Sequence, residues 1–378
     1  MKTKLNIGLI FGGRSVEHDI SILSGLQVYH AIDKEKYNIN IFYIDKYFNI
    51  YTDISLSDIN TFRLEKYKNL PKVTFYNKDN QVIYKGIDKK KIEGNIDIFI
   101  PVVHGEGVED GIIIGYLNTL NATHTLSDIQ SSSIAQDKIY TKIILEKYNI
   151  CVVPYIGVTF DRYTELLEQD ITNKLSFPLI IKPARLGSSI GIKTVYKKDE
   201  LKKTLLEVNK YGNRILVEQK IENFKEYNIA ILKEGSTIIT SSIEEVVKTD
   251  EILSFKDKYE KNQKYEENKH RIIPADISSD LESQIRNMCI EAYNVLNLNG
   301  VVRIDTIYDI ENNKLYLNEI NTIPGSLSFY LFDVGGITFT KLIDMLIKNA
   351  ILKKNKETSY LKLFDSNILN SKTIVLNK

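Results

Sequence analysis

The beginning of the chain carries the pattern that most restricts its fold. Residues 5–11 are mostly apolar and run into two consecutive glycines. Residues 21–32 then repeat apolar side chains at helical spacing, at Ile22, Leu26 and Tyr29. A buried strand, a glycine turn and a helix in this order are typical of α/β proteins. The opening therefore predicts an α/β domain at the N-terminus.

Two later segments extend this prediction to about residue 125. Residues 37–45 (YNINIFYID) and 95–105 (NIDIFIPVVHG) both have the composition of strands. The second is almost continuously apolar, as expected of a parallel strand that is covered on both faces. We therefore expect a sheet of the doubly wound type in this part of the chain.

The pattern changes to α+β after residue 125. Residues 131–150 predict one helix with serines at its start, and short β segments with one helix follow as far as about residue 226. Strands of an antiparallel meander resume at residue 227, and residues 254–270 are charged and predict a loop. Two more helices are expected over about 280–296 and 339–352, with a polar tail after Lys353.

Length and charge limit the classes of partner. The chain has 378 residues, which exceeds the size that a single hydrophobic core usually supports, so two or three domains are expected. Its 50 Lys and Arg residues balance 49 Asp and Glu residues, which argues against nucleic acid or a membrane surface as a partner. Cys151 and Cys289 have no metal-ligand spacing, and the N-terminal apolar run is too short for export. A reduced, cytoplasmic protein is expected.

Residues 303–321 (RIDTIYDIENNKLYLNEIN) predict a β-hairpin with oxygen ligands at its open end. Asp305 and Glu319 stand on adjacent strands, and Glu319 and Asn321 share a face because they are two residues apart. Arg303 and Asp305 share a face for the same reason. Carboxylate and amide oxygens suit magnesium, which commonly bridges to phosphate. A polar, solvent-facing stripe is the alternative for any one of these carboxylates.

A glycine- and serine-rich loop follows a strand that contains a lysine. Lys182 lies in an apolar run, and Gly187, Ser188, Ser189 and Gly191 come directly after it. Free N–H groups and hydroxyls in such a loop can surround a phosphate, although the spacing of a Walker loop is absent. A lysine in so apolar a strand needs an anionic partner. The segment therefore predicts a phosphate site, with a plain hairpin turn as the alternative.

Two polar residues are expected near the carboxyl ends of the N-terminal strands. His104 follows a buried strand, where ligands of open α/β sheets bind. Glu17 follows the first glycine turn at the start of a helix, where it either complements the helix dipole or holds the ammonium group of a ligand. A structural histidine remains the alternative for His104.

Six motifs in fixed order together resemble the D-alanine–D-alanine ligase family, whose members have the ATP-grasp fold. The motifs are GGRSVEHDISILSG, HGEGVEDG, KPARLGSSIGI, VEQKIENFKEYNIA, SFKDKY and NEINTIPGS. The resemblance runs from about residue 5 to residue 350. It implies an N-terminal Rossmann-like domain in residues 1–125, a central lid in 126–226, a C-terminal domain with an ω-loop in 227–353, and a polar tail in 354–378.

The resemblance also implies the nucleotide site. Asp305, Glu319 and Asn321 match ligands of two Mg²⁺ ions, which Mn²⁺ can replace. The residues that match contacts to ATP are Lys138, Lys182, Ser188 and Ser189 at the phosphates, Glu218 at adenine, Glu226 at the ribose, and Lys258 of the ω-loop.

The resemblance further implies how the substrates are held. Glu17 matches the partner of the first D-alanine's ammonium group, with His104 close by, and Tyr259 matches an ω-loop tyrosine directed towards Glu17 and Ser188. Arg303 and the Gly325 N–H match donors to the tetrahedral oxyanion. Tyr330 takes the place of the serine that most members use for the second substrate's carboxylate, and Leu331 follows it.

The implied function is ATP-dependent formation of D-alanyl-D-alanine for peptidoglycan synthesis, by a cytoplasmic homodimer. A D-Ala-D-Ser ligase is an alternative because Tyr330 changes the second subsite. A D-Ala-D-lactate ligase is disfavoured by the Lys258–Tyr259 pair. A ligase of L-amino acids would change the Glu17 and His104 side of the site. A non-catalytic ATP-grasp protein would lack metal ligands or Arg303, and all of these are present.

Overall fold

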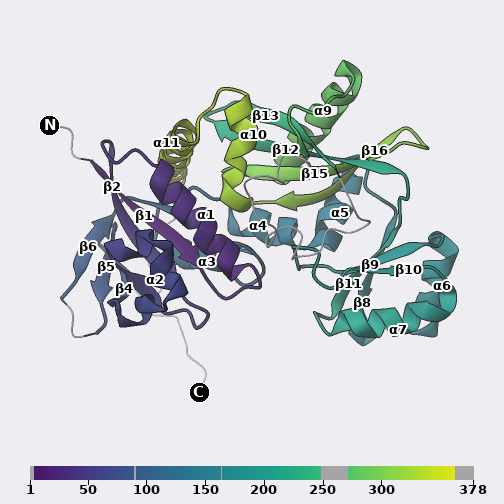
Figure 1. The fold of residues 1–378 in the computed structure, drawn as a ribbon, viewed down its shortest axis with the longest axis horizontal. Coiled ribbons are helices and arrows are strands. Elements are labelled where there is room, and N and C mark those ends of the chain that lie inside the picture. Colours follow the sequence, from purple (N-terminus) through teal and green to yellow (C-terminus); the bar gives the residue numbers. More distant parts are fainter. Residues whose placement is uncertain (1–3, 89–90, 163, 248–270, 362–378) are drawn as a thin grey trace, which may run out of the picture.

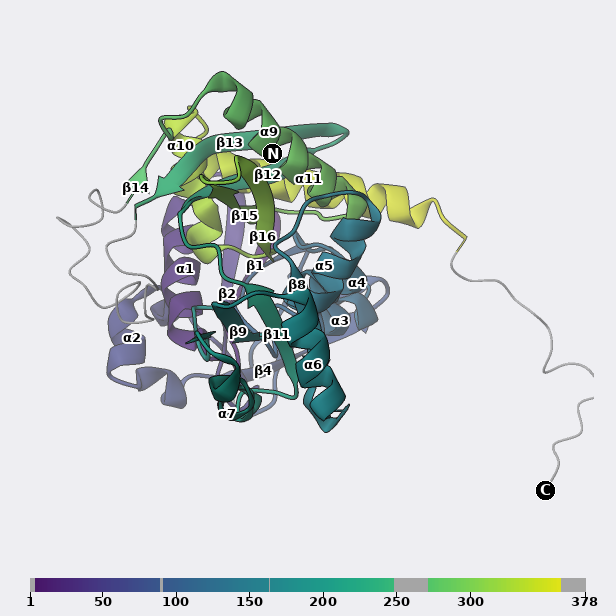
Figure 2. The same ribbon diagram turned by 90° about the vertical axis from the view of Figure 1, so that its right-hand side faces the viewer.

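The computed structural model describes residues 4–88, 91–162, 164–247 and 271–361. The described chain forms three sheets (Figure 1). In both views the C-terminal sheet lies above the small central sheet (Figures 1 and 2). The predicted loop at 254–270, with Lys258 and Tyr259, lies outside the described residues.

The N-terminal sheet has seven strands in the order β6-β5-β4-β3-β2-β1-β7. Its strands are β1 (Leu5–Gly12), β2 (Tyr37–Ile44), β3 (Ile50–Thr52), β4 (Lys72–Lys78), β5 (Gln81–Gly86), β6 (Glu93–Ile96) and β7 (Ile98–Val102). Its helical segments are α1 (His18–Ala31), η1 (Ile54–Ser57), α2 (Ile59–Arg63), η2 (Lys66–Asn69) and α3 (Ile112–Thr119).

The prediction of a doubly wound sheet is correct for only three of these strands. β2, β1 and β7 are parallel neighbours, whereas β3 to β6 are added antiparallel. For β4 and β5 the reason is a short connection: Asp79 and Asn80, both with positive φ, join the two strands as in a tight hairpin turn. A two-residue turn leaves no room for the crossover that a parallel pair needs.

The helix predicted over residues 131–150 is two helices, α4 (Ile129–Gln136) and α5 (Lys138–Lys147). Asp137 between them has extended backbone angles, φ −92° and ψ 101°, and its carboxylate accepts hydrogen bonds from the first backbone N–H groups of α5. An aspartate that caps a new helix in this way competes with continuation of the old one. The prediction of one helix is therefore wrong at Asp137.

The central unit is a four-stranded antiparallel sheet in the order β10-β9-β11-β8. Its elements are β8 (Tyr155–Thr159), η3 (Phe160–Arg162), α6 (Glu165–Lys174), β9 (Leu179–Pro183), β10 (Lys193–Val195), α7 (Lys198–Asn209) and β11 (Arg214–Gln219). Buried residues of α6 and α7, among them Ile171, Leu201 and Leu205, form one core with the sheet.

The C-terminal sheet is antiparallel in the order β14-β13-β12-β15-β16. Its elements are β12 (Phe224–Glu234), β13 (Thr237–Val246), β14 (Arg271–Ile272), α9 (Ser279–Val295), β15 (Val302–Asp309), β16 (Lys314–Asn321), η5 (Gly325–Ser328), α10 (Phe329–Val334) and α11 (Phe339–Thr358). The predicted 303–321 hairpin is confirmed as β15 and β16. α11 continues past Lys353, where a polar tail was expected.

One core joins the first and last parts of the chain. Leu342, Ile343 and Leu346 of α11, together with Ile323 and Leu327, pack in the same buried cluster as the N-terminal sheet. The loop after β16 is therefore held between the two domains. This junction places the ends of β1, β7 and β16 close to one another.

Candidate active site

The open end of the β15–β16 hairpin brings the predicted metal ligands together. Asp305 pairs with Glu319 in the register, and Arg303 pairs with Asn321. Arg303 donates to both carboxylate oxygens of Asp305, at 2.7 and 2.8 Å, and Asn321 Nδ2 donates to Asp305 Oδ2 at 3.1 Å. Lys138 Nζ lies 3.7 Å from Glu319 Oε2. The two strands thus assemble a compact polar cluster.

The charge state of Asp305 fits a cation site. Its side chain is buried, and burial raises its pKa to about 6, although Arg303 acts in the opposite direction. Glu319 and Glu226 add to the increase. A hard cation at these oxygens would offset the unfavourable burial of negative charge. Among the described residues no three His, Cys, Asp or Glu side chains form a complete cluster, so phosphate oxygens and water would have to complete the coordination.

A pocket opens beside this cluster. The residues that line it come from four segments of the fold: Glu17 and Glu109 from the N-terminal domain, Gln136, Lys138 and Thr141 from α4 and α5, Gly187 and Ser188 from the loop after β9, and Glu319 and Asn321 from β16. Residues as far apart in sequence as 17 and 321 therefore face one cavity. A ligand in this pocket would lie among residues of the N-terminal, central and C-terminal parts of the chain.

The glycine-serine loop reaches the N-terminal domain at Glu17. Ser188 Oγ donates a short hydrogen bond to Glu17 Oε1. A Cβ on Gly187 would lie 3.3 Å from the same oxygen, so the glycine allows this close approach without a shift of the Glu17 side chain. Ser188 and Ser189 have φ of 53° and 59°. The predicted proximity of Glu17 and Ser188 is present in the structure.

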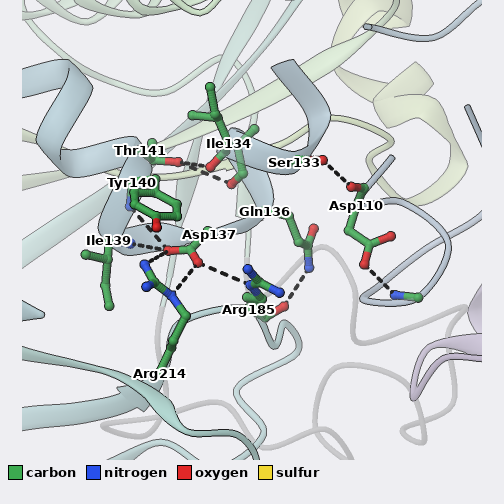
Figure 3. A network of polar contacts seen from close by, with 12 residues as sticks. Asp110, Ser133, Ile134, Gln136, Asp137, Ile139, Tyr140, Thr141, Arg185 and Arg214 are labelled. Atoms are coloured by element: carbon green, nitrogen blue, oxygen red, sulfur yellow. Dashed lines mark hydrogen bonds and ion pairs between the residues drawn. The ribbon is translucent and has the colours of Figure 1, made fainter. Parts of the chain in front are cut away.

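The start of α5 anchors this loop. Lys138 N–H donates to Ala184 O at 2.9 Å, and Lys138 Nζ donates to Leu186 O at 2.8 Å. Figure 3 shows Asp137 between two arginines: Arg185 Nε at 3.2 Å and Arg214 Nε at 2.8 Å. Asp137 is completely buried and satisfied by five donors. The break between α4 and α5 thus helps to fix the glycine-serine loop that follows β9.

Lys182 has the anionic partner that its burial demands. Its Nζ lies 2.5 Å from Glu218 Oε2, and Lys142 Nζ lies 2.7 Å from Glu218 Oε1. Burial alone raises the pKa of Glu218, but Lys142 and Lys182 outweigh it and lower the pKa to about 2. When both lysines are protonated, the group carries an excess positive charge, and burial lowers the pKa of Lys142 accordingly. Lys142 was not identified from sequence, although it lies one helical turn after Lys138, on the same face of α5.

His104 is buried and uses both ring nitrogens within the protein. Nδ1 lies 2.8 Å from Ile323 O and Nε2 lies 3.0 Å from Ser24 Oγ. Burial lowers the pKa of His104 to about 4, so the ring is neutral near pH 7. A direct contact between His104 and substrate stays a prediction. Its neighbour Glu109 accepts from Gly105 N–H, Thr322 Oγ1 and Ile323 N–H.

The residues predicted for the second substrate have different environments. Tyr330 Oη donates to Glu244 Oε2 at 3.2 Å, and the Arg271 guanidinium lies 5.0 Å from the Tyr330 ring centre. Burial raises the pKa of Tyr330 to about 12. The Leu331 side chain is fully buried in the core. Only Tyr330 of this pair therefore presents its side chain to a polar environment.

The other predicted residues have simple positions. Glu226 is half-buried on β12, near enough to Asp305 to raise its pKa. Gly325 begins η5, and apart from its chain neighbours no atom of the described residues lies within 4 Å of the position that a Cβ would take. Lys258 and Tyr259 lie outside the described part of the chain, so their roles stay predictions.

Comparison with known proteins agrees with the motifs. Residues 6–127 match the family model described as D-ala D-ala ligase N-terminus, and residues 144–348 match D-ala D-ala ligase C-terminus. The D-alanine–D-alanine ligase of Thermosipho africanus is 37% identical over 372 residues, which is 97% of this chain and 99% of the relative.

Two solved structures have the same fold over nearly the whole chain. The D-alanine-D-alanine ligase of Coxiella burnetii has a TM-score of 0.80 at 27% identity, covering 94% of this chain and 96% of its own. The VanG D-Ala:D-Ser ligase of Enterococcus faecalis has a TM-score of 0.77 at 25% identity, covering 92% and 100%. With both family models matched in order, the chain belongs to the D-alanine–D-alanine ligase family.

Proposed function

We propose that this protein joins two molecules of D-alanine to D-alanyl-D-alanine with the hydrolysis of ATP, for the synthesis of peptidoglycan precursors. A carboxylate has no leaving group of its own, so it must first be activated. The carboxylate of the first D-alanine attacks the γ-phosphate of ATP, so ADP leaves and an acyl phosphate forms. The ammonium group of the second D-alanine loses a proton, and the resulting amine attacks the acyl carbon, from which phosphate leaves. The observation that carries the proposal is the pocket that Glu17, Lys138, Ser188, Glu319 and Asn321 line together.

Asp305, Glu319 and Asn321 would hold two magnesium ions in this proposal. Their oxygens are of the hard type that Mg²⁺ prefers, and the raised pKa of Asp305 indicates a carboxylate that gains from a neighbouring cation. Bound magnesium would neutralise charge that develops on the transferring phosphoryl group. Arg303, which Asp305 holds in place through two hydrogen bonds, remains beside the metal ligands.

The phosphate end of ATP is assigned to Lys138, Lys182, Ser188 and Ser189. The excess positive charge of the Lys142–Glu218–Lys182 group supports this, because an anion nearby would balance it. Glu218 keeps acceptor lone pairs beside its two lysine contacts, so it can still meet the adenine edge. Glu226 is assigned to the ribose, and Lys258 to the nucleotide as part of the ω-loop.

The substrates are assigned to the other side of the pocket. Glu17 pairs with the ammonium group of the first D-alanine, with His104 nearby, and Tyr259 closes over them. Arg303 and the Gly325 N–H stabilise the oxyanion, a role in which one donor typically contributes about 2.7–4 kcal/mol. Tyr330 and Leu331 border the second subsite.

The alternatives are less well supported. One structural neighbour is named a D-Ala:D-Ser ligase, at 25% identity. The relative with 37% identity over almost the full chain is named a D-alanine–D-alanine ligase. A non-catalytic protein is not favoured, because Arg303, Asp305, Glu319 and Asn321 are all present and in contact or adjacent.

We also propose a homodimer in the cytoplasm. No helix in the described ranges has both the length and the apolar character needed to cross a bilayer. Analytical ultracentrifugation at several protein concentrations tests the assembly: a single sedimenting species of twice the chain mass supports it, and a species of the chain mass contradicts it.

The function is tested by measuring phosphate release from ATP with magnesium and identifying the products by mass spectrometry. The arms are D-alanine alone, D-alanine with D-serine, D-alanine with D-lactate, and L-alanine. We expect release and D-alanyl-D-alanine with D-alanine alone. Preferential formation of a mixed product would support a different second substrate, and silence in all arms would contradict a ligase.

A further inference from the structure

The loop that joins β16 to η5 is held by the N-terminal domain. Both backbone polar groups of Ile323 are held: its N–H donates to Glu109 Oε1 at 2.9 Å, and its carbonyl oxygen lies 2.8 Å from His104 Nδ1. Ser326 N–H donates to Ser24 Oγ at 3.0 Å. Ser24 belongs to α1, which lies against this part of the chain (Figure 1). Side chains from the other end of the sequence therefore determine the path of residues 322–326.

The donor and the acceptor of each hydrogen bond among Ser326, Ser24, His104 and Ile323 follow from the chemistry of the partners. The Ile323 carbonyl can only accept, so His104 Nδ1 carries the proton. His104 is neutral near pH 7, so Nε2 has no proton and accepts from the Ser24 hydroxyl at 3.0 Å. Ser24 Oγ in turn accepts from Ser326 N–H. The result is one closed path: Ser326 N–H to Ser24, Ser24 to His104, and His104 to Ile323.

The backbone that begins at the Ser326 end of this path needs such support. Ser326, Leu327 and Ser328 have φ of 52°, 52° and 47°, in the left-handed region. This conformation costs a residue with a side chain roughly 1–2 kcal/mol, and it persists where surrounding contacts determine it. The N–H of Ser326 and the carbonyl of Ile323 are the two held points, and Gly325 lies between them. Fixing both ends fixes the direction of the Gly325 N–H.

We propose that Ser24 and His104 are positioning residues, which together hold the Gly325 N–H in the direction required for the ligation. Neither touches the reacting atoms in this proposal. They act through the backbone of Ile323 and Ser326. Two side chains of the N-terminal domain thus position a donor of the oxyanion site, which lies on the C-terminal domain. The inference rests on the proposed ligase function.

Ser21 provides a matched control for Ser24. It is a buried serine on the same helix, and its Oγ also accepts one backbone N–H, from Gly12 at 2.8 Å, and donates to one acceptor, Val102 O at 2.6 Å. Its contacts stay within the N-terminal domain. A comparison of Ser24→Ala with Ser21→Ala therefore separates the loss of a buried hydrogen bond from the loss of the contact to the loop.

We expect Ser24→Ala to lower kcat by about 10- to 100-fold, because small misplacement of a catalytic group has effects of this size. The KM for ATP should change by less than about threefold, since the nucleotide contacts lie elsewhere. Ser21→Ala should lower the melting temperature similarly and keep kcat within about threefold. Equal kcat values for the two variants at equal melting temperatures would overturn the proposal. Recovery of kcat in Ser24→Thr, which restores the hydroxyl, would support it.

A second experiment combines Ser24→Ala with His104→Asn. If the two residues act as one unit, the double variant should have a kcat within about threefold of the slower single variant. Multiplicative losses would mean that they act separately and would contradict the proposal. The kcat–pH profile of His104→Asn should have unchanged midpoints, because a positioning histidine does not titrate during turnover. A missing limb would instead make His104 an acid–base catalyst. His124→Asn is the control, since His124 is also buried but bonds to Asn118.

A measurement without turnover distinguishes failure of this inference from failure of the proposed function. ¹⁵N NMR of the ring nitrogens in wild-type protein should show neutral His104 protonated at Nδ1 from about pH 6 to 9. A proton on Nε2, or a charged ring in this range, would overturn the hydrogen-bond path even in an active ligase. The expected tautomer in a protein that forms no D-alanyl-D-alanine would leave the path intact and refute the function.

Discussion

Two buried carboxylates on different sheets, Glu218 of β11 and Asp305 of β15, have pKa values that move in opposite directions. Burial raises both. Lys142 and Lys182 outweigh it at Glu218, whose pKa falls to about 2. At Asp305 the single arginine, Arg303, does not outweigh the effect of burial. Glu319 and Glu226 raise the pKa of Asp305 further, to about 6.

The difference in pKa indicates the charge of the ligand that each region favours. Two lysines and one glutamate leave net positive charge beside the phosphate loop, which favours an anion. Arg303, Asp305, Glu319 and Glu226 together carry net negative charge, which favours a cation. Equal burial thus leads to opposite electrostatic demands, and ATP with magnesium would meet both. Four experiments test this comparison.

The largest effect is expected for Glu319→Ala. Loss of this metal ligand should lower phosphate release by at least about 1,000-fold, because stabilisation of phosphoryl charge by a metal is worth several kcal/mol. Glu311→Ala, an exposed change in the turn of the same hairpin, is the control and should remain active. Near wild-type turnover of Glu319→Ala with magnesium would remove Glu319 from the metal site.

Glu218→Gln should have the next largest effect, this time on stability. It leaves two buried lysines without a carboxylate, and breaking a buried ion pair typically lowers the free energy of unfolding by about 3–5 kcal/mol. Urea unfolding measures this change. Glu207→Gln breaks an exposed pair with Lys193 in the same unit and should cost about 0–1 kcal/mol. Similar losses of unfolding free energy in the two variants would mean that the Lys142–Glu218–Lys182 group contributes no more to stability than an exposed ion pair does.

Lys142→Met should have a smaller effect, because Lys182 and Glu218 remain as a one-to-one pair. Removal of the excess charge should raise the KM for ATP about fivefold with little change in kcat, which corresponds to roughly 1 kcal/mol of electrostatic interaction. Lys147→Met, at the exposed end of the same helix, is the control. An unchanged KM would show that the positive excess does not contribute to nucleotide binding.

The fourth experiment follows the pH dependence of stability without magnesium. The Glu218 pKa of about 2 lies below its ordinary 4.5, so its stabilisation is complete above 4.5 and is lost as the pH falls towards 2. The Asp305 pKa of about 6 lies above its ordinary 3.8, so stability decreases as the pH rises from 3.8 through 6.

Urea unfolding across this pH range separates the two groups. Asp305→Asn should abolish the decrease towards pH 6, and Glu218→Gln should abolish the loss at low pH. Magnesium should diminish the Asp305 dependence in the wild type, because a bound cation favours the ionised carboxylate. A decrease towards pH 6 that persists in Asp305→Asn would assign it to another group, such as Glu109, whose burial raises its pKa to about 7.

Several parts of the site followed from sequence because local pattern and local geometry coincide. The hairpin that carries Asp305, Glu319 and Asn321 was predictable from alternation and a turn, since strand pairing then determines which residues face one another. Lys182 demanded an anionic partner because its strand is apolar. The sequence did not identify that partner as Glu218 shared with Lys142, because the pairing depends on how β11 and α5 pack.

The mistakes also have physical causes. One continuous helix was expected over residues 131–150, because the carboxylate of Asp137 does not disturb helical periodicity. Its cap and its arginine partners become visible only when Arg185 and Arg214 are brought near. The antiparallel pairing of β4 with β5 depends on the two-residue turn at Asp79 and Asn80, which was not identified from composition.

By itself, the sequence determined the strand, glycine turn and helix at the N-terminus, the β15–β16 hairpin, the order of the six motifs and the chemical types available at the site. These properties depend on side chains that are close along the chain. Only the tertiary structure decided that Ser24 and His104 hold the loop around Gly325, and that Glu17 meets Ser188. Contacts between residues hundreds of positions apart arise from the packing of whole domains, which no local pattern encodes.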